Sequence, residues 1–257
     1  MPVTWFAHQA PVLPLKMVRP TWFDATALCV GSMTPDLMYS FSSSVDIHTH
    51  AWLPAIAYGL PITLVLSTIV RFVVAPVGAH QLPDLGTFRL HSYAVLSRRR
   101  PHPLLTAASA IIGIVSHIAL DAFTHEGRWG VRWVGYDDVA VRIGGFTKPL
   151  ATVFQYIGHT LGSLVAVLLL WAIGRRRLLD EWYGPDAVEH ARAAIFDRSQ
   201  RVAFWSLTAA GALGGLLWGA NDYVDHIQRV AVATFAGATA GSLIVRVRRD
   251  ERSAAGL

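Results

Sequence analysis

Charged residues are scarce in this chain. Only 15% of its 257 residues are Asp, Glu, Lys or Arg, whereas 53% are hydrophobic. Soluble domains carry about a quarter of charged residues, so this scarcity excludes an ordinary soluble domain and indicates an integral membrane protein. Cysteine is nearly absent too. Cys29 is the single one, forms no intrachain disulfide and, lying in an apolar run, is expected to serve packing.

Other signals are missing as well. The net charge of +5 is not accompanied by alternating basic and aromatic residues, so we expect no nucleic-acid partner. No basic region precedes the first apolar stretch, MPVTWFAHQAPVLPL, which argues against a cleaved signal peptide. Because the chain has no internal repeat and no low-complexity tract, residues 1–257 are expected to form a single integral membrane domain.

Long apolar runs make up much of the sequence. A helix needs about 20 apolar residues to span a bilayer, and five runs approach that length, with a shorter and weaker sixth at residues 22–39. The five are residues 51–70, 104–124, 150–173, 202–220 and 229–247. We therefore predict an all-α, polytopic membrane protein with five to six transmembrane helices and a short or re-entrant N-terminal helix pair. Arg71, just after the first run, is expected to snorkel to the headgroup layer.

The distribution of basic residues predicts the orientation. Arginines concentrate at 80–103, at 174–201 and in the tail VRVRRDER, with two predicted spans between each basic stretch and the next. The positive-inside rule assigns these stretches, and so the C-terminal tail, to the cytoplasm. Residues 40–50, 125–149 and 221–228 then lie on the outer side of the plasma membrane, although 125–149 carries four basic residues of its own.

The segment SHIALDAFTHEG places polar residues at the end of the second run. His117, Asp121 and His125 are spaced by four, so on one helix all three project from one face. Ionisable groups in a membrane-spanning segment are costly and usually mark a site with a partner for them. We expect that partner to be a metal ion. The alternative interpretation is that these three residues form a polar seam that hydrogen-bonds neighbouring helices.

The rise of a helix per residue places these three residues too far apart to form a metal site by themselves. His117 and His125 would lie roughly 12 Å apart along the axis, at about 1.5 Å per residue, whereas zinc–ligand bonds are about 2 Å. Two ions with Asp121 between them, or one ion with one of the three residues orienting a ligand, would both suit this distance. Other segments must complete the site.

Further candidates fall on the predicted outer side. Asp36 is a ligand or a helix cap, His50 is a ligand or a loop residue, and His8 reaches the outer side only through a short re-entrant hairpin. A weaker group is interpreted as loop or helix-interface residues: His48, His159, Asp222, Asp225 and His226. The histidines of the predicted cytoplasmic loops are assigned no role: His80, His91, His102 and His190.

Several of these segments together resemble a known family. FAHQAPVLPL, VGSMTPD, THAWLPAIAYGLPI, GIVSHIALDAFTHEGRWGV and QYIGHTLGS resemble a family of bacterial membrane proteins of unknown function, distantly similar to the inner-membrane metal-dependent hydrolases. The resemblance covers residues 1–170; residues 171–257 add two predicted spans and the basic tail. It implies a metal site formed by His8, Asp36, His50, His117 and Asp121, with His125 as an additional member. Those hydrolases carry a Pro-Asp-x-Asp run where this chain has Pro-Asp-Leu-Met, which removes one ligand.

These observations predict a zinc-dependent hydrolase of esters or phosphoesters. Zinc held by imidazoles and a carboxylate activates a water, and Asp121 or Asp36 takes the proton if it is not a ligand. Arg128 and Arg132 would pair with a phosphate, which points to a lipid or lipid-linked substrate. The alternative is a non-enzymatic membrane protein, such as a transporter, an ion or proton path or an assembly protein, in which the polar stripe is an interhelical seam.

Overall fold

The computed structural model describes residues 4–41, 50–219 and 223–254, and most of these residues are helical. Short helices come first: α1 (Thr4–Ala7), α2 (Leu13–Val18), α3 (Ala25–Gly31), α4 (Thr34–Leu37) and the 3-10 turn η1 (Met38–Phe41). The long helices follow: α5 (Trp52–Ile69), α7 (Pro103–Ala122), α9 (Leu150–Arg175), α12 (Arg198–Leu217) and α13 (Tyr223–Ala254). The all-α prediction is confirmed.

Shorter elements connect the long helices. After α5 the chain continues through η2 (Val70–Val74), a π-helical turn, into α6 (Ala75–Gly78), and then through the 3-10 turns η3 (Gly86–Phe88) and η4 (Leu90–Arg98). Between α7 and α9 lie α8 (Trp129–Val134) and an antiparallel hairpin of β1 (Ala140–Ile143) and β2 (Phe146–Pro149). The helices α10 (Leu178–Tyr183) and α11 (Pro185–Arg192) lead from α9 to α12.

Within the described residues, four helices are long and apolar enough to cross a membrane: Trp52–Gly78, Pro103–Ala122, Leu150–Arg175 and Asp225–Arg249. The predicted five to six spans are therefore not confirmed. Residues 202–220 lie largely in α12, but this helix carries Arg198, Gln200 and Arg201 in its first turn and ends at Leu217, which leaves a shorter apolar stretch than in the four. Glycines of α12 serve packing, because a Cβ on Gly211 would lie 3.0 Å from the Cα of Gly237 on α13.

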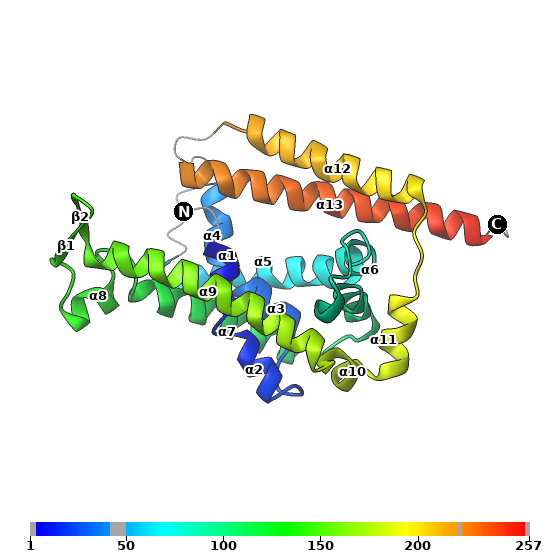
Figure 1. Ribbon diagram of the computed structural model, residues 1–257, viewed down its shortest axis with the longest axis horizontal. Helices are drawn as coiled ribbons and strands as arrows, with labels where there is room; N and C mark the ends of the chain where they lie inside the picture. Colours follow the sequence, from blue (N-terminus) through cyan, green and yellow to red (C-terminus); the bar gives the residue numbers. More distant parts are fainter. Residues whose placement is uncertain (1–3, 42–49, 220–222, 255–257) are drawn as a thin grey trace.

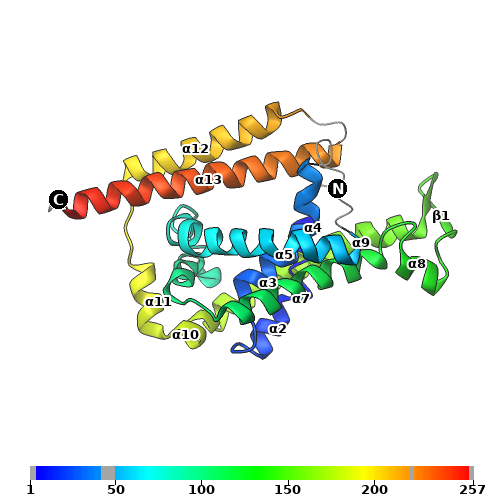
Figure 2. The ribbon, with the colours of Figure 1, turned by 180° about the vertical axis from the view of Figure 1, so that it is seen from behind.

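The stretch 22–39, predicted as a weak sixth span, is not one helix. Its helices α3 and α4 are separated by Ser32 and Met33. Pro35 lacks an N–H and belongs at the start of a helix rather than inside one, so a new helix begins here. The break gives the segment a bend instead of a span, and Figure 2 shows α3 between α5 and α7.

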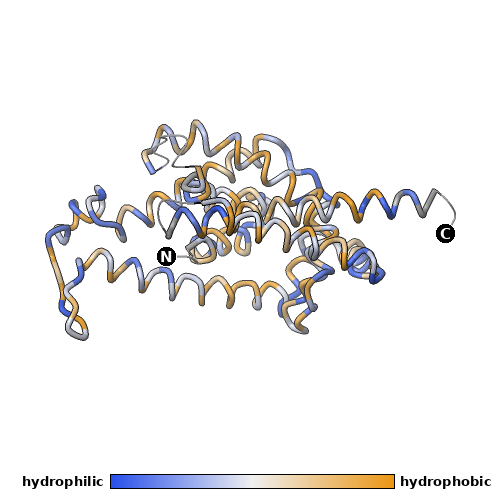
Figure 3. Tube along the Cα trace, turned by 90° about the horizontal axis from the view of Figure 1, so that it is seen from above, coloured by the Kyte–Doolittle hydropathy of each residue, from blue (hydrophilic) through white to orange (hydrophobic). Residues whose placement is uncertain are grey.

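The two ends of the molecule differ in the loops that they carry. Figure 1 shows η4, α10, α11 and the C-terminus toward one end, where the chain leaves α5–α6, α9 and α13, and α8 with the β-hairpin at the other end. In Figure 3 hydrophilic residues gather toward these ends, and the helices between them are mostly hydrophobic. The basic stretches 80–103 and 174–201 thus lie on the same end as the basic tail, because α12 and α13 form an antiparallel pair that returns the chain to it.

Arg71 does not snorkel as expected. Its side chain is buried and forms an ion pair with Asp24, which also accepts hydrogen bonds from Thr106 and from the backbone N–H groups of Thr26 and Ala27 at the start of α3. The reason is that α5 continues through η2 and α6, so Arg71 lies inside a 27-residue helical segment rather than at its end. The ion pair ties this segment to α3 and α7.

Candidate metal centre

The helix α7 supplies two of the residues singled out by the sequence. His117 is fully buried and Asp121, one turn later, is 4% exposed. The predicted stripe of three residues on one helix is wrong at its end, because α7 stops at Ala122 and His125 lies in the turn that follows. In that turn Phe123 is the C-cap, and its carbonyl accepts a hydrogen bond from the hydroxyl of Tyr136.

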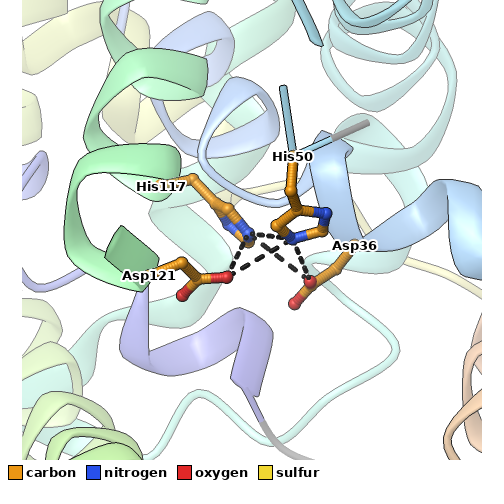
Figure 4. Close-up of side chains that lie close together, drawn as sticks. All are labelled: Asp36, His50, His117 and Asp121. Atoms are coloured by element: carbon orange, nitrogen blue, oxygen red, sulfur yellow. Dashed lines mark hydrogen bonds and ion pairs between the residues drawn. The ribbon is translucent and has the colours of Figure 1, made fainter. Parts of the chain in front are cut away.

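Two further residues meet His117 and Asp121. Figure 4 shows His50 and Asp36 turned toward the α7 pair, and one ligand atom from each of the four lies within 4.8 Å of the other three. The Nε2 atom of His117 is 3.3 Å from Asp121 Oδ2, 3.4 Å from Asp36 Oδ1 and 3.3 Å from His50 Nε2. His50 Nε2 is 3.5 Å from Asp36 Oδ1 and 3.3 Å from Asp121 Oδ2. We call these four residues the His/Asp cluster.

A close contact between α3 and α7 positions one ring of the cluster. Gly31 and Gly113 allow the two backbones to approach, since a Cβ on Gly31 would lie 2.5 Å from the carbonyl oxygen of Ala110. The carbonyl of Ser32, at the end of α3, accepts a hydrogen bond of 2.8 Å from His117 Nδ1. With the proton on Nδ1, the lone pair of Nε2 points into the cluster, as in histidines that bind metals.

Asp36 and His50, which precede α5 in the chain, lie outside the candidate membrane spans. Burial by itself lowers the pKa of His50, but hydrogen bonds to Asp121 and Asp36 raise it above its ordinary value. Burial would raise the pKa of Asp36, yet the neighbouring His117 and His50 hold that pKa well below its usual range. The two shifts are reciprocal, because the carboxylates favour the charged form of His50 and the imidazoles favour the charged form of Asp36.

His8 and His125 lie next to the cluster rather than in it. Asp121 turns Oδ1 toward both of them, at 3.7 Å from His8 Nε2 and 3.6 Å from His125 Nδ1. The ring of His8 stacks on that of His117, with centroids 3.8 Å apart. Burial and the neighbouring His117 lower the pKa of His8 to about 3. His125 is 28% exposed in its side chain, and its Nε2 is 2.7 Å from Nε2 of Gln155 on α9.

Some buried atoms around the cluster have no hydrogen-bond partner. They include Oδ1 of Asp121, Nδ1 of His8 and Nδ1 of His159. His159 was interpreted as a helix-interface residue, and its ring lies 6.4 Å from that of His8 and 6.3 Å from that of His125. Because buried polar atoms are nearly always satisfied by protein, water or ions, this group of atoms marks a polar region around the cluster with capacity for further hydrogen bonds or ligands.

The arginines predicted to bind substrate lie at the margin of this region. Arg128 is half-buried at the start of α8, and its charge contributes to lowering the pKa of His125, which burial lowers first. Arg132 is exposed in the last turn of α8. Asp225 and His226 begin α13 and are not in the His/Asp cluster. His48 and Asp222 lie outside the described residues.

The sequence did not single out two residues that orient the site. Ser32 acts through its backbone carbonyl, which leaves no signal in the side-chain pattern. Gln155 precedes His159 by four residues in α9, so the two lie on the same face of that helix. The four-residue spacing between Gln155 and His159 is the one sequence signal that points to Gln155.

Comparison with known proteins places the chain in a family. No curated protein and no solved structure matches it. One family model, described as a domain of unknown function (DUF4184), matches residues 1–248. That match extends well past residue 170, where the motifs that carry the sequence resemblance stop. The chain therefore belongs to the DUF4184 family, a family of unknown function.

Proposed function

We propose that the protein is a membrane metalloenzyme that hydrolyses an ester or phosphoester with a divalent ion, such as zinc, held by Asp36, His50, His117 and Asp121. The observation that carries the proposal is the geometry of the His/Asp cluster. Five of its six ligand–ligand distances are between 3.3 and 3.5 Å. Four ligands placed about 2.0–2.1 Å from one zinc ion in a tetrahedron are about 3.3–3.4 Å apart.

The charges of the ligands support the same assignment. Two carboxylates and two neutral imidazoles carry a formal charge of −2, which a divalent ion neutralises. Without a cation, two carboxylates would lie buried beside each other, that of Asp121 at the end of a helix that qualifies as a membrane span and that of Asp36 on α4, at a high desolvation cost. The hydrogen bond from His117 Nδ1 to Ser32 supplies the outer support that zinc-binding histidines have.

The residues around the cluster suit hydrolysis. A bound zinc ion lowers the pKa of a water and polarises a carbonyl or phosphoryl oxygen. Asp121 uses Oδ2 toward the cluster, so its Oδ1, which has no hydrogen-bond partner, is placed to accept a proton from a water. Asp36 takes that role if Asp121 binds the ion through both oxygens. Arg128 supplies positive charge at the margin of the site for an anionic substrate.

An apolar cavity supports a lipid or lipid-linked substrate. It has a volume of about 560 Å³ and is lined by side chains of α3, α5, α9 and α13. None of the four cluster residues lines it, but Met33 and Leu37 do. They precede and follow Asp36 in the chain, and Met33 is next to Ser32. Such a cavity accommodates an apolar chain attached to a head that reaches the cluster.

Metal analysis of the purified protein tests the proposal. The wild type is expected to carry about one divalent ion per chain, and the double variant His117→Ala/Asp121→Ala none. His190→Ala removes an exposed histidine and should keep the ion. In mixed micelles, the loaded wild type should hydrolyse lipid esters or phosphoesters and stop when a chelator removes the ion.

Two results would contradict the proposal. A wild type that binds no divalent ion after zinc, manganese or cobalt is supplied would leave the cluster as a hydrogen-bonded seam between helices. A metal-loaded protein that hydrolyses no lipid or soluble ester but moves ions into proteoliposomes would identify a transporter instead.

A further inference from the structure

A second cavity lies at the opposite end of the molecule from α8 and the β-hairpin. It has a volume of about 660 Å³ and is lined by residues of α6, η2, η4, α11 and α13. Figure 1 shows these elements meeting near the end at which the C-terminus lies. Two candidate spans contribute side chains near their ends, Trp52–Gly78 and Asp225–Arg249, and Arg98 and Arg100 of the wall lie just before the third, Pro103–Ala122.

The cavity is lined by a selected set of basic residues: Arg98, Arg100, Arg246, Arg249 and His190. The sequence around them does not distinguish them from their neighbours. In the run Arg98-Arg99-Arg100 the first and last arginines line the cavity and Arg99 does not, because its guanidinium lies over the ring of Tyr183. Near the C-terminus Arg246 and Arg249 line it, and Arg248 does not.

Contacts with the wall hold several of these guanidinium groups in place. Arg249 donates a hydrogen bond of 3.1 Å to the carbonyl of Ile195 and lies 4.6 Å from the centre of the Phe196 ring. Arg246 donates to the carbonyl of Phe72, and Arg100 lies over the ring of the same residue. A guanidinium has five N–H donors, so one bond to a carbonyl leaves most of them for a ligand.

The charge of this wall is not balanced by acids. No Asp or Glu is among the described residues that line the cavity. Asp84, an acid of the adjoining η3–η4 region, is already bound by Arg192 at 2.7 Å. Four arginines around one cavity repel each other, and an anion with several acceptor oxygens relieves this repulsion. The walls between the arginines are apolar, with Phe72, Val77 and Phe196.

We propose that this cavity binds the phosphate group of an anionic phospholipid. The arginines would contact the phosphate, and the apolar wall at the ends of the membrane spans would adjoin the start of the acyl chains. Basic pockets between membrane helices on the cytoplasmic side bind anionic head groups in this way. The site is separate from the His/Asp cluster, so its occupation does not depend on the proposed hydrolase activity.

Lipid-dependent stabilisation of the purified full chain tests this proposal. Wild type in detergent is titrated with phosphatidylglycerol, with phosphatidylcholine and with inorganic phosphate, and the shift of the melting temperature is recorded for each. Phosphatidylglycerol should raise the melting temperature most. In Arg100→Gln/Arg249→Gln the concentration needed for half of the shift should rise roughly thirty-fold, the loss expected when two arginines near a lipid phosphate are removed.

The matched control is Arg99→Gln/Arg248→Gln, which removes the same charge from neighbouring positions that do not line the cavity. It should respond to phosphatidylglycerol as the wild type does. An equal loss in the control would mean that this basic end attracts anionic lipids diffusely, and would overturn the proposal. Equal stabilisation by phosphatidylcholine, or by inorganic phosphate at the same concentration, would overturn it too.

Discussion

Replacing Gly113 by alanine should empty the His/Asp cluster without touching a ligand. Gly113 lies on α7 one turn before His117, where α7 meets α3. A Cβ at this position would lie 2.8 Å from the backbone nitrogen of Ser32, and closer still to the carbonyl oxygen of Leu28. Ordinary contact begins at 3.4 Å, so α3 must move away from α7 by at least 3.4 − 2.8 = 0.6 Å.

This displacement is large for a metal site. Ser32 holds His117 through its carbonyl, and Asp36 follows in the next helix, so both move with α3. Metal–ligand distances tolerate a deviation of about 0.2 Å, which is a third of the smallest displacement of α3. The steric conflict should also destabilise the fold by about 1–3 kcal/mol, more than the ~1 kcal/mol that alanine gains over glycine in a helix.

The assay compares wild type, Gly113→Ala and Gly214→Ala in the same detergent. Gly214 lies on α12 and a Cβ there meets nothing within 4 Å. This control should keep its metal and be as stable as the wild type or more so. In Gly113→Ala the bound metal should fall, and the melting temperature should drop by roughly 2–12 °C, since 1 kcal/mol shifts it by about 2–4 °C in a chain of this size.

A Gly113→Ala protein with full metal content and an unchanged melting temperature would refute this reasoning. It would mean that α3 and α7 separate at no cost, so the close backbone contact would not be what positions Ser32 against His117. If Gly113→Ala kept its full metal content but was less stable, the contact between α3 and α7 would matter for the stability of the fold but not for metal binding by the His/Asp cluster.

Three further outcomes are expected. Arg71→Leu leaves the buried carboxylate of Asp24 without its cation and should cost about 3–5 kcal/mol of stability, with Arg71→Leu/Asp24→Asn less damaging in the same thermal scan. Burial raises the pKa of Cys29 to about 12, so maleimide should label it slowly at pH 8 in the folded protein and quickly after denaturation; equal rates would contradict the raised pKa. A chelator should lower the melting temperature of the wild type, because an ion bound only by the folded state stabilises it by about 2.7 kcal/mol at a hundredfold excess over Kd, and should leave His117→Ala/Asp121→Ala unchanged.

The sequence predicted where the long apolar helices lie better than it predicted how many of them are candidate membrane spans. Runs of strongly apolar residues became α5, α7, α9 and α13, because apolar side chains at that length have few alternatives to a helix. Residues 202–220 were less clear. They are apolar, but the helix that contains them carries Arg198, Gln200 and Arg201 in its first turn and ends at Leu217, and it is not among the candidate spans. The capping box at Asp197 sets the start of α12 before the apolar run begins, so the apolar run alone did not give the limits of the helix.

The candidate site was predicted in its parts but not in its assembly. The spacing of His117 and Asp121 places them on one face of α7 regardless of the rest of the fold. His125 was expected on the same helix, but the helix ends before it, and it contacts Asp121 from the following turn. Which of His8, His50 and Asp36 would meet the α7 pair depended on how the segments before α5 pack against α7, and no spacing along the chain encodes that.

Local rules thus determined that this protein is helical and apolar, and that a polar pair lies one turn apart in an apolar helix. These properties depend on side chains close together in the sequence. Only the tertiary structure decided that Asp36 and His50 complete the His/Asp cluster while His8 and His125 stay beside it, and that Arg98 and Arg100, but not Arg99, line the basic cavity. The reason is physical: both sites are formed by segments far apart in the chain that only the packing of helices brings together, as the close backbone contact between Gly31 and Gly113 does for the His/Asp cluster.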